Sequence, residues 1–328
     1  MKNKISAIIL NWNGENIILE CLKSLLNQTY KNLEIIIIDN GSTDDSFKQA
    51  CDFLKKRNIS FKSEKFPENT GFANGMNAGI KIATGEYVIL LNEDLILDSN
   101  YLEKAMSIMS NNNELGGVGG LIYKLINGVK TSEIDATGSI LQNRFKTRRV
   151  ENPDEPSLTF GVSGSCPLFR IATLKDVELI YKDNYYDSDY FAYFEDMDLF
   201  FRCQLRGWKF YYDPKMIAWH VRSASMGGES KTLDKPDFFQ VKVLRNRYLT
   251  IYKNLSYLML FKKLPYFIIT ELALITLIIF KYPKSFKNLL RAYKEFISTF
   301  SETKNKRKFI QKNRIVSDSY INGFFKGF

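Results

Sequence analysis

The segment Tyr87-Val88-Ile89-Leu90-Leu91-Asn92-Glu93-Asp94 joins an apolar run to a polar end. Its first five residues are typical of a β-strand that is buried on both faces of a sheet. A carboxylate at the end of such a strand suits a divalent cation that bridges two phosphates, because Mg²⁺ and Mn²⁺ prefer oxygen ligands. A helix cap or a turn would also explain an aspartate at this position.

Apolar runs with polar ends also occur earlier in the chain. Ile5–Leu10 leads into Asn11-Trp12-Asn13-Gly14, and Leu33–Ile38 leads into Asp39-Asn40-Gly41-Ser42. Strands that alternate with helices predict an α/β fold whose parallel sheet is covered on both faces. Ligands of such sheets bind at the carboxyl ends of the strands, so the polar ends are expected at one rim. The remaining expected elements are a strand at Ile59–Phe61 and helices near 17–26, 44–54, 72–83 and 101–109.

Two of the polar segments could bind a nucleotide. Asp39 could accept a hydrogen bond from the imide nitrogen of uracil or thymine, although Asp-Asn-Gly-Ser is also ordinary turn chemistry. In the segment 68–79, glycines would let the backbone approach a ligand, and the start of a helix would offer free amides to a phosphate.

An aromatic and acidic segment follows at 190–198. Three carboxyl groups among aromatic residues are costly to bury without partners, and such surroundings raise a carboxyl pKa towards the range of a general base. Asp198 and Arg202 are four residues apart and are expected to pair on one helix face, which leaves Asp196 and its neighbour Glu195 for chemistry. His220 is the only histidine, so a histidine-based triad or zinc site of the usual kind is excluded.

Together and in this order, these segments resemble family 2 glycosyltransferases, in particular their rhamnosyltransferase-like branch. The resemblance covers about residues 2–254 and implies a GT-A fold, which is a Rossmann-like fold of nucleotide-diphospho-sugar transferases. It is carried by Asn11–Gly14, Asp39–Ser42, Glu68–Phe72, Asn92-Glu93-Asp94, Glu195–Asp198 with Arg202, Gly207-Trp208 and His220.

The resemblance also implies a role for each matching residue. Asp196 is expected to be the catalytic base with Glu195 beside it, and Asp94 and His220 are expected to hold Mg²⁺ or Mn²⁺. Asn92-Glu93-Asp94 stands in the place of the family's Asp-x-Asp motif, with asparagine first. The expected residues of the nucleotide-sugar site are Asn11, Trp12, Asn13, Asp39, Asn69, Gly71, Asn77, Asn92 and Glu93.

The implied reaction is an inverting sugar transfer to a glycan or a polyprenyl-linked acceptor in cell-surface polysaccharide synthesis. By resemblance, dTDP-rhamnose is the first expected donor, and a UDP-hexose or UDP-N-acetylhexosamine is the next. The alternative is a non-catalytic, nucleotide-sugar-binding scaffold subunit of a membrane complex. We expect a catalytic domain at 1–240, with a donor half at about 1–115 and an acceptor half at about 116–240, and a helical extension at 241–328.

The expected extension is basic as well as apolar. From Lys242 onward the chain has 18 basic and 4 acidic residues, a local balance of +14 within a total of +10. The apolar stretch Leu264–Phe280 is at the short limit for a membrane span, and lysines flank it at Lys262, Lys263, Lys281, Lys284 and Lys287. This pattern favours helices that lie on an anionic membrane surface. An ordinary helical pair packed on the catalytic domain is the alternative.

Other features concern the partners and the compartment of the protein. No nucleic-acid partner is expected, because large aliphatic residues alternate with the basic ones, and Lys304–Lys308 is interpreted as a solvated face. The short apolar start is interpreted as a strand instead of an export signal. Four scattered cysteines suit a reduced compartment. We therefore expect a cytoplasmic protein, peripheral at the inner face of the cell membrane.

Overall fold

Four parallel strands at the centre of the sheet carry the polar ends. The computed structural model describes residues 3–15, 17–221 and 231–327. The strands lie side by side in the order β3–β2–β1–β4, and the register places Asn11 beside Asp39 and Leu10 beside Asn92. The predicted rim is therefore present. The four strands are β1 (Ile5–Asn11), β2 (Leu33–Asp39), β3 (Phe61–Lys65) and β4 (Tyr87–Asn92).

Helices cover both faces of these strands, as the alternating pattern predicts. Ala7 and Ile9 face one side of the sheet, where α1, α2 and α4 pack, while Ile8 and Leu10 face the side of α3. The apolar faces of the helices exclude water from both sides of the parallel strands. The helices are α1 (Ile18–Leu26), α2 (Ser46–Lys55), α3 (Phe72–Ile82) and α4 (Tyr101–Ser110).

The second half of the sheet is mixed instead of parallel. β11 pairs antiparallel with both β4 and β6, β12 runs parallel to β6, and β5 and β7 pair with β12 and β6. β6 and β7 form an antiparallel hairpin, and a separate two-stranded sheet of β8 and β9 follows. The bounds are β5 (Leu95–Leu97), β6 (Leu115–Ile126), β7 (Val129–Ala136), β8 (Ser139–Gln142), β9 (Lys146–Arg149), β10 (Ser157–Thr159), β11 (Leu168–Arg170) and β12 (Lys209–His220).

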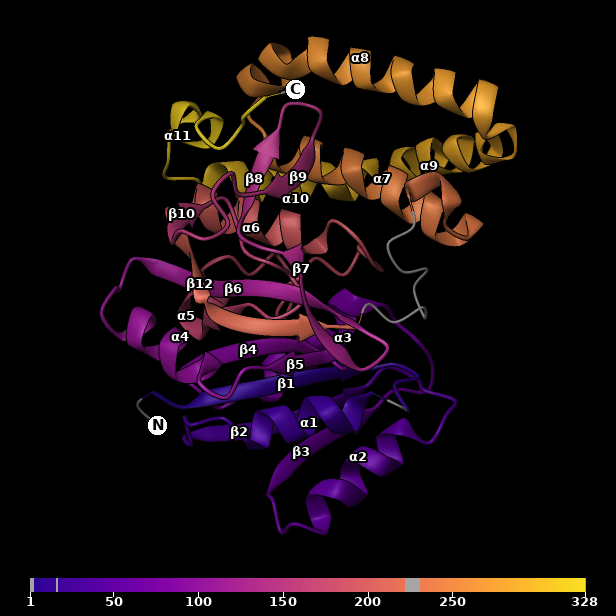
Figure 1. Cartoon of the computed structure of the whole chain (residues 1–328). Coiled ribbons are helices and arrows are strands. Elements are labelled where there is room, and N and C mark those ends of the chain that lie inside the picture. The colour runs from indigo at the N-terminus through magenta and orange to yellow at the C-terminus, as the bar shows by residue number, and fades with distance from the viewer. Residues whose placement is uncertain (1–2, 16, 222–230, 328) are drawn as a thin grey trace.

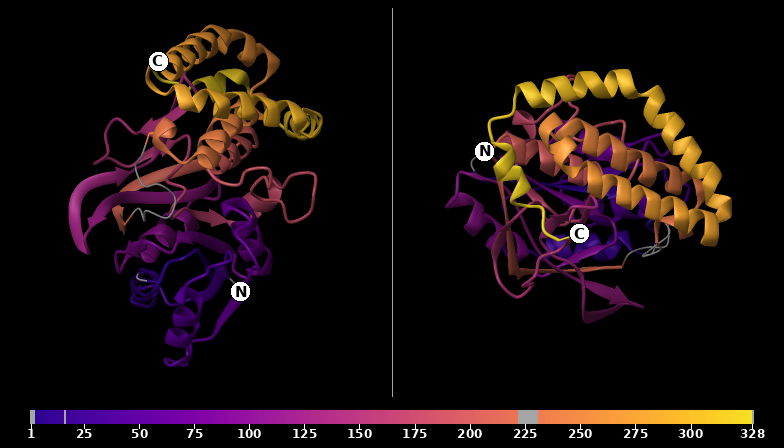
Figure 2. Two further views of the ribbon diagram at one scale, coloured as in Figure 1. Left: turned by 90° about the vertical axis from the view of Figure 1, so that its right-hand side faces the viewer. Right: turned by 90° about the horizontal axis from the view of Figure 1, so that it is seen from above.

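The C-terminal helices stack on α6, at the end of the molecule opposite α2 (Figure 1). The two further views agree with this arrangement (Figure 2). Their bounds, with those of two short 3-10 helices, are α5 (Ile171–Asp176), α6 (Glu195–Leu205), η2 (Thr232–Asp234), α7 (Asp237–Asn254), α8 (Tyr257–Lys281), η3 (Pro283–Ser285), α9 (Phe286–Ser298), α10 (Phe300–Lys312) and α11 (Asp318–Asn322).

The apolar core runs across the expected boundary at residue 240. Ile251, Met259 and Ile310 from the C-terminal helices share one cluster with Phe200 of α6 and Leu90 of β4. The helical extension is therefore packed on the catalytic half, and its removal would expose part of that core to water.

Two local expectations are wrong. The third strand begins at Phe61, where the expected segment Ile59–Phe61 ends, because β3 pairs with β2 from Ile35 to Asp39. Lys304–Lys308 is not a uniformly solvated face, since Lys306 and Arg307 are 1% and 3% exposed. Their charges are met by groups of earlier segments, which the run of basic residues alone does not reveal.

Helix α8 is longer than the apolar stretch that indicated it. Its 25 residues include Pro265, and by length and composition it could cross a membrane. Only 11% of its most apolar window is buried in the structure, and Phe261 and Phe280 are 74% and 83% exposed. Of the flanking lysines, Lys263 is buried and donates to Asn143.

Candidate active site

A cavity of about 750 Å³ opens at the carboxyl ends of β1 and β4. Such a volume is typical of small-molecule sites. Nine of the predicted site residues contribute to its wall, and Asn11, Asn13, Asp39 and Asn77 do not. The nine are Trp12, Asn69, Gly71, Asn92, Glu93, Asp94, Glu195, Asp196 and His220.

Hydrogen bonds, two of them buried, stabilise the loops after β1 and β2. The Asn11 amide donates to Asp39 Oδ1 at 2.7 Å, and the Ser42 backbone N–H donates to Asp39 Oδ2 at 3.1 Å. Asn13 Oδ1 accepts from the Thr43 backbone N–H at 2.9 Å. Asn11 and Asp39 are 0% exposed, so in this structure they shape the rim from beneath. Their predicted contact with a nucleotide stays a prediction.

The start of α3 contributes backbone to the cavity. Gly71 has φ of +91°, and a Cβ there would lie 2.5 Å from the Phe191 carbonyl oxygen. Asn69 Oδ1 accepts from the Gly71 backbone N–H at 2.9 Å. Asn77 lies farther along the helix, where its amide donates to the Tyr186 carbonyl and its oxygen accepts from the Tyr186 backbone N–H, both at 2.8 Å. Asn77 thus ties α3 to the segment that precedes α6.

Asp94 and His220 meet at the cavity wall, and a third residue, Asp135, contacts His220. Asp94 Oδ1 lies 3.1 Å from His220 Nε2, and Asp135 Oδ2 of β7 lies 2.9 Å from His220 Nδ1. Burial by itself would lower the pKa of His220, but hydrogen bonds to Asp135 and Asp94 outweigh it and raise the pKa to about 9. Sequence reasoning missed Asp135.

The pair Asp94–His220 fits one divalent cation. With Nδ1 donating to Asp135, Nε2 faces the Asp94 carboxylate, so a proton or a cation must lie between these two acceptors. Adjacent ligands of an octahedral cation with bonds of about 2.1 Å lie about 3 Å apart. Within residues 3–15, 17–221 and 231–327, no group of three or more histidine, cysteine or acidic side chains could hold a metal. The other ligands would therefore be phosphate oxygens and water.

Glu195 and Asp196 begin α6 after an unusual turn. Tyr193 and Phe194 both have a positive φ, 69° and 70°, a conformation that is uncommon for bulky residues and that clusters at functional sites. Asn246 of α7 stabilises the turn, because its amide donates to the carbonyls of Ala192 and Tyr193 at 3.0 and 2.9 Å. Asn246 is a second residue that sequence reasoning missed.

Three carboxyl groups of the cavity have raised pKa values. Burial, reinforced by the neighbouring charge of Asp196, raises the pKa of Glu195 to about 8. Burial also raises the pKa of Asp196, and burial with the charge of Asp94 raises the pKa of Glu93 to about 8. In such surroundings a carboxylate is a stronger base than it is in water, and a general base must take up a proton. A Cβ at Gly164 would lie 2.8 Å from Asp196 Oδ2, so glycine there leaves room for this carboxylate.

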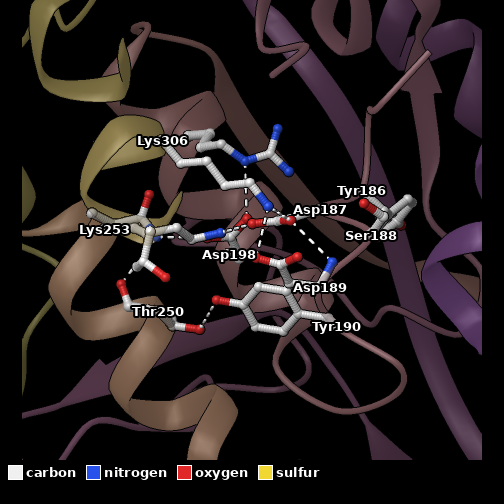
Figure 3. A network of polar contacts seen from close by, with 12 residues as sticks. Tyr186, Asp187, Ser188, Asp189, Tyr190, Asp198, Thr250, Lys253 and Lys306 are labelled. Atoms are coloured by element: carbon white, nitrogen blue, oxygen red, sulfur yellow. Dashed lines mark hydrogen bonds and ion pairs between the residues drawn. The ribbon is translucent and has the colours of Figure 1, made fainter. Parts of the chain in front are cut away.

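A buried charge network supports α6 from the side of the C-terminal helices (Figure 3). Asp198 pairs with Arg202 at 3.0 Å, as predicted, and with Lys253 of α7 at 2.9 Å. Lys306 of α10 lies 2.7 Å from Asp187, which also pairs with Lys253. Burial would lower the pKa of Lys306, but the charges of Asp187 and Asp189 outweigh it and raise the pKa. The extension thus supplies Lys253 as a counter-charge of Asp198 in α6, and Lys306 as a counter-charge of Asp187 in the segment that precedes α6.

Known proteins with similar sequences cover the part of the chain that holds the rim. The sequence profile described as glycosyl transferase family 2 matches residues 6–177. A poly-beta-1,6-N-acetyl-D-glucosamine synthase of Staphylococcus epidermidis is 28% identical over 230 residues, which are 68% of this chain and 51% of that protein. An uncharacterized glycosyltransferase of Haemophilus influenzae is 28% identical over 57% of this chain and 58% of that protein. The chain spans about half the length of these curated relatives.

Solved structures with low sequence identity share the fold. S. aureus TarS 1-349 is 18% identical with a TM-score of 0.52, over 95% of this chain and 83% of that one. GalNAc-T7, solved with UDP, GalNAc and Mn²⁺, is 16% identical with a TM-score of 0.62, over 76% and 48%. The fold is thus the expected GT-A fold with a C-terminal helical extension. With its family profile matched over more than half of its length, the chain belongs to glycosyl transferase family 2.

Proposed function

We propose that this protein is an inverting glycosyltransferase that moves one sugar from a nucleotide carrier to an acceptor hydroxyl. The observation that carries the proposal is the shared cavity of Asp94, His220, Glu195 and Asp196. A cation-binding pair and a pair of carboxyl groups with raised pKa values meet there at the rim of the parallel strands.

In the proposed reaction Asp196 is the general base. It takes the proton of the acceptor hydroxyl while that oxygen forms a bond to the anomeric carbon from the face opposite the leaving group. The bond from the anomeric carbon to the nucleoside diphosphate breaks, and its electron pair leaves with the diphosphate. Asp94 and His220 would hold Mg²⁺ or Mn²⁺, and the bound cation would neutralise the charge that develops on the diphosphate. A general base contributes about 10²–10⁴-fold to such a transfer.

The donor is proposed to be UDP-linked or dTDP-linked. A UDP-linked sugar is supported by the structures of GalNAc-T7 and TarS that contain UDP, and the name of the S. epidermidis relative concerns an N-acetylhexosamine polymer. A rhamnose donor rests on the sequence resemblance alone. Synthesis of a polysaccharide is proposed from the name of the S. epidermidis relative, and its place at the cell surface rests on the sequence resemblance alone.

A membrane surface is the proposed location of the enzyme. The outer side of α8 presents Phe261, Leu272 and Phe280, which are 74%, 60% and 83% exposed. Exposed lysines accompany them at Lys262, Lys281 and Lys284. An exposed apolar face with adjacent cations suits a helix lying on anionic headgroups, which would place the protein at the inner face of the cell membrane.

The proposed function is tested by a thermal-shift panel of nucleotides and nucleotide sugars with and without Mn²⁺ or Mg²⁺. A ligand at 100 times its Kd stabilises a fold by about 2.7 kcal/mol, which is measurable. Metal-dependent stabilisation by a UDP-linked or dTDP-linked sugar, followed by release of the nucleotide, supports a transferase. Stabilisation without any nucleotide release favours a scaffold, and no stabilisation by any nucleotide contradicts the donor site.

A further inference from the structure

A second cavity, of about 650 Å³, adjoins the active-site cavity. Asp196 contributes to the walls of both cavities, as do Thr147, Tyr193 and Met197. The proposed catalytic base therefore lies where the two cavities meet. A molecule in the second cavity could present a hydroxyl group to Asp196 while the donor occupies the first.

The wall of the second cavity is strongly cationic. Five of the described residues that line it are basic, and the one acidic residue among them is Asp196. The basic residues come from the β8–β9 hairpin region, from the two residues that flank η2 and from α7. They are Arg144, Lys146, Lys231, Lys235 and Arg247.

Arg247 is the most informative of these residues because it is buried and only partly paired. It is 6% exposed, and its Nη1 lies 3.1 Å from Glu271 of α8. Within the described part of the chain, its Nη2 has no hydrogen-bond partner. A buried guanidinium N–H without an acceptor is costly, and an anionic ligand in the cavity would supply one. Desolvation and the charges of Arg144 and Arg247 lower the pKa of Lys146.

The opposite part of the wall is apolar and leads to the outer face of α8. Ala273, Leu274 and Leu277 line the cavity. Leu277 is also 44% exposed, and Phe280 one turn farther along the helix is 83% exposed. Leu277 therefore belongs both to the apolar lining and to the exposed face of α8.

We infer that the second cavity binds an acceptor whose hydroxyl-bearing group is carried on a lipid-linked phosphate or diphosphate, with the anionic phosphate at Arg144, Lys146 and Arg247 and the apolar chain along α8. The inference rests on the proposed function and specifies its acceptor. A neutral glycan would not need five cations, and a nucleic acid would not need the wall of Ala273, Leu274 and Leu277. An amphiphilic phosphate satisfies both parts of the wall.

Farnesyl diphosphate is a suitable probe, because it combines a diphosphate with a short isoprenoid chain. Its binding to the full chain is measured by calorimetry in EDTA, beside inorganic pyrophosphate and farnesol. We expect the double variant Arg144→Gln, Lys146→Gln to bind farnesyl diphosphate at least tenfold more weakly. The matched control, Lys304→Gln with Lys308→Gln, removes two exposed charges that line neither cavity and should bind as the wild type does.

The apolar part is tested separately. Leu277→Gln should weaken the binding of farnesyl diphosphate at least fivefold and leave the binding of pyrophosphate unchanged. Ile297→Gln, at an exposed site outside both cavities, should change the affinity for neither ligand. Equal affinity for pyrophosphate and farnesyl diphosphate would overturn the inference, as would unchanged affinity of the Arg144 and Lys146 double variant.

Metal-dependent nucleotide release, measured on the same preparations, separates the two proposals. If the wild type releases nucleotide and binds no farnesyl diphosphate, the acceptor inference fails and the proposed function stands. If the probe binds as expected and no nucleotide is released, the lipid-phosphate site stands and the transferase assignment fails.

Discussion

The Nδ1 atom of His220 lies 2.9 Å from Oδ2 of Asp135, a residue 85 positions earlier in the chain. The contact fixes the imidazole so that Nε2 faces Asp94 at 3.1 Å. A carboxylate that orients a histidine in this way is the usual support of a metal-binding histidine. The hairpin of β6 and β7 therefore contributes to the candidate site, although β7 is mostly exposed.

Asp135→Asn should weaken Mn²⁺ binding about 10- to 100-fold, because the imidazole loses the partner that orients it. The affinity is measured by Mn²⁺ titration in the presence of the nucleotide that the thermal-shift panel selects. Glu133→Gln is the control, since Glu133 lies on the same strand and its side chain is 57% exposed. Equal Mn²⁺ affinity of Asp135→Asn and the control would show that Asp135 does not support a metal site.

Glu195→Gln should make the protein more stable than the wild type above pH 8. The pKa of Glu195 is raised from 4.5 to about 8 in the folded protein, so the folded state binds this proton more tightly than the unfolded state. Stability is therefore lost as the pH rises from about 4.5 through about 8. Glutamine removes this loss, which is at most about 5 kcal/mol for a pKa rise of this size.

The pH dependence is measured by urea unfolding in EDTA between pH 4 and pH 9. The difference between Glu195→Gln and the wild type should grow with pH, and Glu155→Gln, at an exposed position, should show no such trend. A difference that stays constant across this range would mean that burial does not raise the pKa of Glu195.

Lys306→Met should destabilise the fold by about 3–5 kcal/mol, because it leaves buried negative charge at Asp187 with less compensation. Lys308→Met, on the same helix and exposed, should change stability by less than about 0.5 kcal/mol. Both values come from urea unfolding at pH 7. Equal, small effects of the two substitutions would contradict the structural role of the network.

The double variant Phe261→Ser, Phe280→Ser should reduce binding to anionic phosphatidylglycerol vesicles at least about tenfold, because it removes two exposed apolar side chains from α8. Co-sedimentation at low and high salt measures the effect, and high salt should weaken wild-type binding as well. Leu158→Ser, at a position 59% exposed on β10, is the control. Wild-type protein that stays in the supernatant at low salt would refute the membrane proposal.

The parts of the fold that sequence predicted best are those with local signals. β1, β2, β4 and the helices between them have uninterrupted apolar or periodic patterns, and their polar ends lie at one rim. Asp94 follows β4, Asp196 lies in the first turn of α6 and His220 ends β12, and all three line one cavity. The pairing of Asp198 with Arg202 was predictable, since it is set by one helical turn.

The missed residues depend on contacts that are distant in sequence. Asp135 lies in a region of weak pattern and acquires its role only through His220. Lys306 stands among basic residues that suggest a solvated face, but its partner Asp187 is 119 positions away. Asn246 supports a turn between Ala192 and Phe194 from another helix, and no local signal distinguishes it from a surface asparagine.

The central claim, that Asp196 is the base of a sugar transfer, is tested most directly with Asp196→Asn. The donor affinity and the rate of metal-dependent nucleotide release are measured for the same preparation. The amide cannot take up the proton of the attacking hydroxyl, so we expect donor affinity within about twofold of the wild type and a rate lower by about 10²–10⁴-fold. A rate close to that of the wild type with unchanged donor affinity would contradict the assignment.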